Sequence, residues 1–297
     1  MRVIRGKKAL VTGAASGIGR AIALALAAEG ADLFLLDIKR DELEAVAREA
    51  RGRGVEVITA VHDLAEPDQI GAAVESLRKT WNQLNILVNN AGITYYGQTH
   101  LMTPEQGKRI MAVNLLAPME LTHALLPMLL AAEDAHVLNV CSMFGLVPWR
   151  KTAAYQASKY GLVGFTAALR AEYCRENFGI TALCPGFVRS SLFDDCATDK
   201  ADRRVTVPAW LSTSAERTAA KAIAAIRSNK GLVLVTPVAH LYWRLGRLFP
   251  GLVDWLMREG WRRRGKTDAR KAAAQPIAAN APANEAYKPV NSRGASG

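Results

Sequence analysis

The chain has 297 residues, of which 50 % are hydrophobic and 22 % are charged, so it can form a sizeable core and is not a generally disordered protein. Its net charge is +11, but eleven Lys and Arg against four Asp and Glu lie after Pro237, so the basicity belongs mainly to the C-terminal end. This distribution argues against a uniformly basic nucleic-acid-binding surface, and we expect no nucleic-acid partner.

The cysteines indicate a reducing environment. No C-x-x-C pair or histidine at metal-ligand spacing accompanies Cys141, Cys174, Cys184 and Cys196. The N-terminus carries no apolar secretory segment. We therefore expect buried free thiols, no metal site and a cytoplasmic location.

From Lys7 to Pro237, short apolar runs alternate with longer stretches in which apolar residues recur every three or four positions. This alternation predicts a doubly wound, Rossmann-like α/β domain, with a seven-stranded parallel sheet and helices on both faces. The expected strands are Ala9–Thr12, Asp32–Asp37, Val55–Val61, Leu84–Asn89, His136–Ser142, Ile180–Cys184 and Leu232–Val235. The expected helices include Gly17–Glu29, Arg40–Arg53, Pro67–Trp81, Thr152–Asn177 and Ala215–Ser228.

The rhythm changes in two places. Phe187–Ser212 mixes large apolar residues with charged ones, which predicts a long insertion over the active site. After Pro237 the sequence becomes basic and aromatic, and its last part is rich in Ala, Pro and Asn. We therefore divide the chain into a dinucleotide-binding and catalytic domain (1–237), an amphipathic helical extension (238–265) and a disordered tail (266–297).

A glycine-rich segment, Thr12–Gly19, follows the first strand and opens a helix. It places backbone N–H groups beside the pyrophosphate of a dinucleotide, although its Gly-x-x-x-Gly-x-Gly spacing alone also fits a structural turn. Asp37 ends the second strand about 20 residues beyond the loop, where a carboxylate can bind both ribose hydroxyls of NAD and repel a 2′-phosphate. Lys39 and Arg40 leave NADP as the alternative cofactor.

Tyr155 and Lys159 lie four residues apart near the start of a long predicted helix, so they share one face. A free phenol has a pKa of about 10, and a neighbouring ammonium lowers it. Ser142 ends the fifth strand at the carboxyl edge of the sheet, where open α/β sheets bind ligands. The same edge collects the ends of other strands at Gly13, Asn89–Gly92 and Pro185–Gly186. The sequence therefore predicts one crevice for cofactor and substrate.

Over approximately Lys7 to Pro237, these motifs together resemble those of the short-chain dehydrogenase/reductase family. The matching residues are Thr-Gly-x-x-x-Gly-x-Gly at Thr12–Gly19, Asn-Asn-Ala-Gly at Asn89–Gly92, Asn114, Ser142, Tyr-x-x-x-Lys at Tyr155–Lys159 and Pro-Gly at Pro185–Gly186. The resemblance implies an oxidoreductase that moves a hydride between a nicotinamide cofactor and an alcohol or carbonyl group.

The resemblance also implies the role of each catalytic residue. Tyr155 would exchange a proton with the substrate oxygen, and Ser142 would hydrogen-bond the same oxygen. Lys159 would lower the pKa of Tyr155 and bind the nicotinamide ribose. Asn114 would hold a water that links Lys159 to solvent.

Further residues would bind the cofactor, with Asp63 and Leu64 at the adenine. Ser190 stands where the family often has Thr, and Ser16 and Ile38 stand where NADP-using relatives commonly have a basic residue, which favours NAD. The full expected set is Gly13, Ser16, Gly17, Ile18, Gly19, Asp37, Asp63, Leu64, Asn90, Gly92, Tyr155, Lys159, Pro185, Gly186, Val188 and Ser190.

Three segments expected to border the nicotinamide are rich in apolar and aromatic residues: Thr94–Tyr96, Met143–Trp149 and Phe187–Trp210. They predict a small hydrophobic substrate, a lipid-like, steroid-like, retinoid-like or aromatic secondary alcohol or ketone, although such residues can also cap a core. A non-catalytic NAD(P)-sensing or scaffold protein is the alternative function. Since relatives often pair through the helices carrying Asn114 and Tyr155, we expect a homodimer or homotetramer.

The extension contains two amphipathic segments separated by Pro250–Gly251. In the first, an apolar stripe of Val238, Leu241, Tyr242, Leu245, Leu248 and Phe249 is expected opposite His240, Arg244 and Arg247. The arginines exclude a membrane-spanning segment. Two interpretations stay open: docking on this domain or a partner subunit, or peripheral contact of residues 238–264 with the inner face of a membrane.

Overall fold

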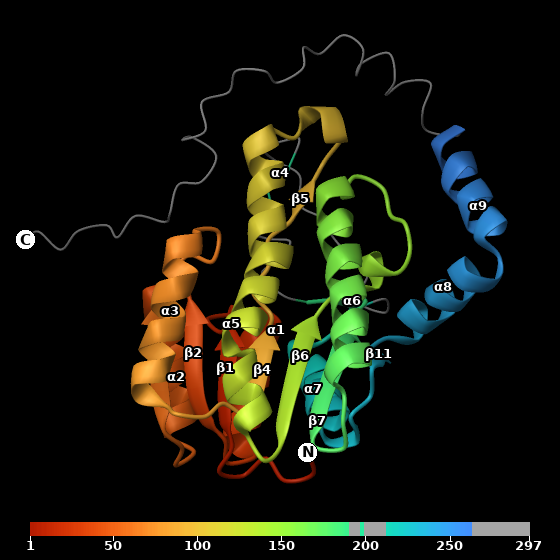
Figure 1. Cartoon of the computed structure of the whole chain (residues 1–297). Helices are drawn as coiled ribbons and strands as arrows, with labels where there is room; N and C mark the ends of the chain where they lie inside the picture. The colour runs from red at the N-terminus through yellow and green to blue at the C-terminus, as the bar shows by residue number, and fades with distance from the viewer. Residues whose placement is uncertain (190–196, 199–211, 263–297) are drawn as a thin grey trace, which may run out of the picture.

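A seven-stranded, wholly parallel sheet forms the centre of the protein (Figure 1). The structure is a computed structural model that describes residues 1–189, 197–198 and 212–262. The strand order is β11-β7-β6-β4-β1-β2-β3, as in a doubly wound sheet. The strands are β1 Lys8–Thr12, β2 Asp32–Asp37, β3 Val57–Val61, β4 Ile86–Asn89, β6 Ala135–Val140, β7 Phe178–Cys184 and β11 Leu232–Leu234. All seven predicted strands are confirmed.

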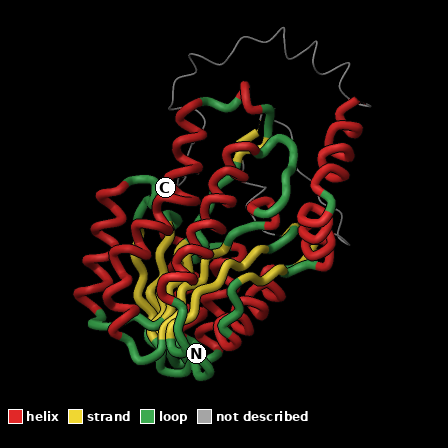
Figure 2. The backbone as a smooth tube through the Cα atoms, turned by 45° about the vertical axis from the view of Figure 1, so that its right-hand side comes forward, coloured by secondary structure: helices red, strands yellow, loops and turns green. Residues whose placement is uncertain are grey.

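Helices cover both faces of the sheet (Figure 2). One apolar core joins the sheet to α1 (Gly17–Ala28), α2 (Arg40–Arg51) and α7 (Ala215–Ser228). A second core, on the other face, includes side chains of α3 (Pro67–Thr80), α5 (Ala117–Ala131) and α6 (Ala153–Tyr173). The sequence predicted a longer α6, reaching Asn177. The helix ends earlier because the backbone becomes extended at Cys174, where ψ is 121°.

The stretch Pro104–Ala131 is helical throughout, comprising α4 (Pro104–Met111), a π-helical turn (Ala112–Leu116) and α5. Among the described residues it is the one helix that is long and apolar enough to cross a membrane. However, 44 % of its most apolar stretch is buried, and Leu121 and Leu125 pack into the core. Packing on the sheet accounts for much of its apolar character.

Short strands close over the carboxyl edge of the sheet. β5 (Tyr95–Tyr96) pairs with β9 (Ala197–Thr198), and β8 (Phe187–Val188) pairs with β10 (Ser212–Thr213). The predicted insertion therefore contributes β8 and β9, and β9 pairs with the segment that follows β4. Ser190, an expected cofactor ligand, lies outside the described residues.

Two helices follow the sheet, α8 (Pro237–Leu248) and α9 (Pro250–Arg262), with the predicted break between them. They lie beside α6 and β11 at one side of the molecule, and α9 extends away from the sheet (Figure 1). The single apolar stripe predicted for the first helix is wrong. Tyr242 packs inward against the ring of Trp149, whereas Leu241 and Leu248 are 63 % and 69 % exposed on the opposite side, together with Arg244.

Candidate active site

The glycine-rich loop between β1 and α1 forms a cradle that side chains would fill. Gly13 and Gly17 have positive φ angles of 64° and 54°, which glycine adopts readily. A Cβ atom on Gly19 would lie 2.0 Å from the carbonyl oxygen of Gly13. Ser16 and Ile18 lie at the start of α1, where the positive end of the helix dipole and the N–H groups of the first turn favour an anion. This geometry fits a dinucleotide pyrophosphate.

The segment after β4 holds this loop in place. The side-chain amide of Asn90 donates to the carbonyl oxygens of Thr12 (3.0 Å) and Gly13 (3.1 Å). In return, the hydroxyl oxygen of Thr12 accepts from the backbone N–H groups of Asn90 (2.9 Å) and Ala91 (3.0 Å). The two predicted cofactor segments are therefore one hydrogen-bonded unit.

The carboxylate of Asp37, at the end of β2, is fixed by three backbone donors. One oxygen accepts from Ala15 at 2.9 Å, and the other accepts from Ile38 at 2.8 Å and Lys39 at 3.0 Å. A carboxylate has more acceptor positions than these three bonds occupy, so it can also receive ribose hydroxyls. The Ala15 contact ties the predicted ribose-binding residue to the glycine loop.

Asp63, after β3, lies next to the buried Leu64 and forms an ion pair that the sequence did not reveal. A guanidinium nitrogen of Arg109, on α4, is 2.7 Å from a carboxylate oxygen of Asp63. The other carboxylate oxygen accepts from the backbone N–H of Ala65 at 2.9 Å. Arg109 therefore fixes the orientation of the residue expected at the adenine.

Ser142, Tyr155 and Lys159 are brought together and buried, with exposed fractions of 7 %, 7 % and 4 %. The Ser142 side chain lies close enough to Tyr155 to act on the pKa of its phenol. The ammonium of Lys159 donates to the carbonyl oxygen of Val140 at 2.9 Å and lies 5.8 Å from the centre of the Tyr155 ring. The helix α6 and the end of β6 thus build one site, as the spacing predicted.

Asn114 sits in the π-helical turn and is fully buried. Its side-chain oxygen accepts from the backbone N–H of Ile93 at 2.8 Å, and its amide donates to the carbonyl of Ile93 at 2.9 Å and to Ser158 at 3.1 Å. A Cβ atom on Gly92 would lie 3.3 Å from the Asn114 side chain and 3.6 Å from the Lys159 nitrogen. Asn114 therefore joins the loop after β4 to α6 beside Lys159.

The end of β7 closes the other side of the crevice. The carbonyl oxygen of Pro185 accepts from the backbone N–H of Met143 at 2.8 Å, one residue after Ser142. Gly186 leaves room for Thr236, because a Cβ atom there would lie 2.3 Å from the Thr236 hydroxyl. Val188 follows in β8 and is buried. These contacts place Pro185, Gly186 and Val188 at the same sheet edge as the glycine loop.

Burial controls the pKa values of the central pair. Desolvation raises the pKa of Tyr155 to about 12, although its hydrogen bond with Ser142 acts in the opposite direction. Desolvation also lowers the pKa of Lys159. Burial therefore raises the pKa of Tyr155, whereas the sequence predicted that Lys159 would lower it. The Lys159 ammonium is bonded to a backbone carbonyl.

Comparisons with known proteins agree with this geometry. Residues 7–201 match the family model described as short chain dehydrogenase. The chain is 31 % identical over 273 residues to the Dehydrogenase/reductase SDR family member 7B of Bos taurus, which covers 89 % of this chain and 84 % of that protein. The chain belongs to the short chain dehydrogenase family.

Two solved structures of family members share its fold. A short chain dehydrogenase/reductase from Burkholderia phymatum in complex with NAD aligns with a TM-score of 0.75 and 26 % identity, over 85 % of this chain and 96 % of that chain. A putative NAD(P)-dependent gluconate 5-dehydrogenase from Beutenbergia cavernae, with bound NADP at low occupancy, aligns with a TM-score of 0.67 and 30 % identity, over 78 % and 95 %. The present chain is thus an NAD(P)-dependent oxidoreductase acting on CH–OH or carbonyl groups.

Several residues of this dehydrogenase site gave no signal in the sequence. Arg109 is one of several arginines on amphipathic helices, and only the fold places it at Asp63. The thiols of Cys141 and Cys184 lie close to Tyr155 and Lys159. The Cys141 side chain and burial hold the pKa of Cys184 well above its usual value, so this thiol stays protonated. Spacing rules cannot find such contacts, because they join elements far apart in the chain.

Proposed function

We propose that the enzyme transfers a hydride between NAD(H) and a hydrophobic secondary alcohol or ketone, of a lipid-like, steroid-like, retinoid-like or aromatic kind. The observation that carries this proposal is the aromatic cluster beside Ser142 and Tyr155. The ring of Phe144 stacks on Trp149 at 5.3 Å, and Phe187 packs edge-on against both at 5.7 and 5.9 Å. An apolar wall next to two hydroxyl groups suits a bulky apolar molecule with one oxygen.

In the proposed mechanism, Tyr155 exchanges a proton with the substrate oxygen. With its pKa raised to about 12, the phenol is protonated at neutral pH and can donate to a carbonyl oxygen during reduction. The Ser142 oxygen already accepts from the backbone N–H of Phe144 at 3.1 Å, which orients the hydroxyl. Ser142 would hydrogen-bond the same substrate oxygen as Tyr155. The nicotinamide, when bound, supplies the hydride donor or acceptor.

Alcohol oxidation requires Tyr155 to lose its proton first. Lys159 would stabilise the phenolate by its positive charge and would bind the nicotinamide ribose. Its position depends on Val140 and on the α6 turn that Asn114 and Ser158 brace. Asn114 would hold the water that connects Lys159 to solvent. The four residues thus form one proton-transfer unit.

We propose the glycine loop, with Asn90 and Gly92, as the pyrophosphate side of the cofactor site, and Asp63 and Leu64 as the adenine side. Pro185, Gly186, Val188 and Ser190 would border the nicotinamide. NAD is the proposed preference, because the fixed carboxylate of Asp37 would repel a 2′-phosphate. Arg40, which is exposed at the start of α2, is the residue that would favour NADP instead.

The test is a screen of hydrophobic secondary alcohols and ketones with NAD(H), read by nicotinamide absorbance. We expect turnover with bulky apolar members of the panel and little with small hydrophilic ones. Tyr155→Phe should retain cofactor binding and lose about 100-fold or more in turnover, because it deletes only the proton-transferring hydroxyl. Near-normal turnover by this variant would overturn the mechanism, and activity confined to hydrophilic substrates would overturn the substrate class.

We also propose that subunits pair through α5 and α6. Four large apolar side chains on these helices and on the preceding π-turn are exposed: Leu116, Met119, Leu130 and Tyr160. Since solvent-exposed apolar groups gather here on neighbouring helices, this face suits a homodimer or homotetramer contact. Light scattering should show an oligomer that Met119→Glu weakens, and a monomeric wild type would contradict the proposal.

A further inference from the structure

An exposed apolar ridge runs along the C-terminal helices. It consists of six large side chains that are 45–69 % exposed: Leu241, Leu248, Phe249, Leu252, Trp255 and Leu256. On α8, Leu241 and Leu248 are seven residues apart and share one face; on α9, Leu252, Trp255 and Leu256 follow helical spacing. Large apolar side chains this exposed and this close together in the chain are unusual on a soluble monomer and often mark an interaction site.

The ridge is not needed to attach the helices to the domain. The opposite faces perform that task, since Tyr242 packs on Trp149 and a Cβ atom on Gly246 would lie 3.2 Å from Val147. The side chain of Arg150 donates to the backbone carbonyl of Met257. Since α8 packs inward through Tyr242 and Gly246 and α9 buries Val253, the exposed ridge lies on the outer side of both helices.

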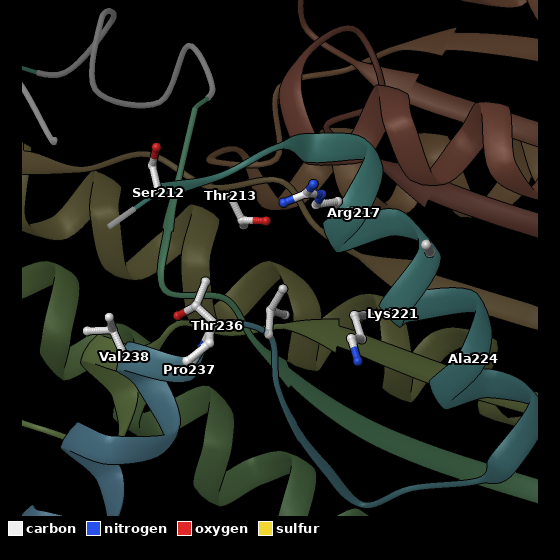
Figure 3. A pocket seen from close by; sticks show the side chains of 10 residues that line it. Ser212, Thr213, Arg217, Lys221, Ala224, Thr236, Pro237 and Val238 are labelled. Carbon is white, nitrogen blue, oxygen red and sulfur yellow. The ribbon is translucent and has the colours of Figure 1, made fainter. Parts of the chain in front are cut away.

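Cations lie at one end of the ridge, beside Leu241. A cavity of about 610 Å³ between α7 and the start of α8 is lined by Arg217, Lys221 and Thr236, among others (Figure 3). A neighbouring cavity of about 470 Å³ is lined by Lys221, Leu241 and Arg244. The two cavities share Lys221, and we call them together the basic groove. Leu241 therefore belongs to both the ridge and the basic groove. No ion pair within the described part of the chain involves Arg217, Lys221 or Arg244.

The charge distribution selects the occupant. A second copy related by a twofold axis would place the same patch opposite itself, so its cations would repel. On α9, the acidic Asp254 is already paired with Arg258 at 3.5 Å. An anionic lipid surface complements both the basic groove and the apolar ridge. Its headgroups would pair with the cations, and its acyl region would accept the apolar side chains.

We propose that the apolar ridge and the adjoining basic groove dock the enzyme peripherally on an anionic membrane surface. The helices carrying the ridge contact the aromatic cluster through Tyr242, which packs on Trp149. Docking would therefore hold the wall of the substrate site close to the lipid. The proposal goes beyond the proposed reaction and is tested without turnover, so either can fail alone.

The experiment is flotation of the full-length protein with two kinds of vesicle, phosphatidylcholine alone and phosphatidylcholine mixed with phosphatidylglycerol. We expect flotation with the anionic vesicles, little with the neutral ones, and weaker flotation as salt is raised. Leu248→Glu should weaken the partition about tenfold, because it removes a Leu side chain from the lipid. Arg244→Glu should weaken it about 30-fold, because it reverses one charge at the surface.

Matched controls lie far from the ridge. Val3→Glu changes a side chain that is 64 % exposed near the N-terminus, and Lys79→Glu reverses an exposed charge at the end of α3. Both should float like wild type. The proposal is overturned if the wild type stays in the soluble fraction with both vesicles, or if the controls lose as much binding as the ridge variants. It is also overturned if Leu248→Glu dissociates an oligomer in the absence of lipid, since a second copy would then occupy the ridge.

Discussion

Gly145→Ala should impair catalysis through the backbone that carries Ser142. Gly145 ends the short 3-10 turn after Ser142, and a Cβ atom there would lie 2.6 Å from the carbonyl oxygen of Lys159. An ordinary contact begins at about 3.4 Å. Either the 3-10 turn or helix α6, which carries Lys159, must therefore move by about 0.8 Å. A misplacement of about 1 Å can cost roughly 100-fold in rate, so we expect a 10- to 100-fold loss of kcat/KM.

The matched control is Gly164→Ala on α6, the helix that carries Lys159. A Cβ atom on Gly164 would meet nothing within 4 Å. This change should leave activity unaltered and stabilise the protein by about 0.5–1 kcal/mol, because alanine favours a helix interior. Gly145→Ala should lower the free energy of unfolding by about 1–3 kcal/mol through overpacking. Turnover, NAD(H) binding and thermal unfolding should be measured for both variants. Wild-type turnover in folded Gly145→Ala would refute the close-packing argument.

Three other predictions test separate parts of the molecule. Lys159→Ala should weaken NAD(H) affinity and turnover, whereas Ser142→Ala should lower turnover by about 100-fold with little change in affinity; equal small effects in kinetics and binding titrations would contradict these roles. Wild type should favour NAD over NADP in kcat/KM, and Asp37→Ala should narrow the ratio; a wild-type preference for NADP would refute this interpretation. Burial, assisted by the charges of the N-terminus and Arg170, lowers the pKa of His136 to about 3. Since the unfolded chain binds this proton below about pH 6.5, stability should fall as pH drops from 6.5 toward 3, by about 2 kcal/mol at pH 5. His136→Gln should flatten this slope in urea unfolding, and an unchanged slope would exclude His136 as its source.

The sequence predicted the layers of the fold well because buried parallel strands are continuous apolar runs. It predicted strand ends less well. Leu84 is fully buried but precedes β4, and Cys141 and Ser142 are buried beyond the end of β6. The apolar pattern reports burial, whereas strand bounds depend on backbone pairing. Burial and strand pairing therefore differ where the chain stops hydrogen-bonding to the neighbouring strand but remains inside the core.

In the site, too, some features could be predicted from the sequence and others depend on the fold. Local motifs predicted Tyr155 and Lys159, since a four-residue spacing on a helix fixes which side chains meet. They could not predict that Lys159 donates to Val140 or that Arg109 pairs with Asp63, because those contacts join elements far apart in the chain. The raised pKa of Tyr155 was hard to foresee for a related reason. The charge of Lys159 was visible in the sequence, but the extent of burial was not.

In the C-terminal helices, the function of each apolar residue depends on the side of the helix on which it lies. The sequence offered docking on the domain and contact with a membrane as alternatives for one apolar stripe. In the structure the apolar residues divide, so that Tyr242 meets Trp149 while Leu241 and Leu248 share the outer face with Arg244. The inner side of the helix therefore docks on the domain, and its exposed outer side is the part that the proposed membrane contact would use. The relative from Bos taurus aligns over 89 % of this chain, more than residues 1–237 comprise, so part of the extension is included in that alignment. An extension that served only to cover the aromatic cluster would need apolar residues on its inner face alone. The outer leucines, and Arg244 with no ion-pair partner among the described residues, are the features on which the proposed contact with an anionic surface rests.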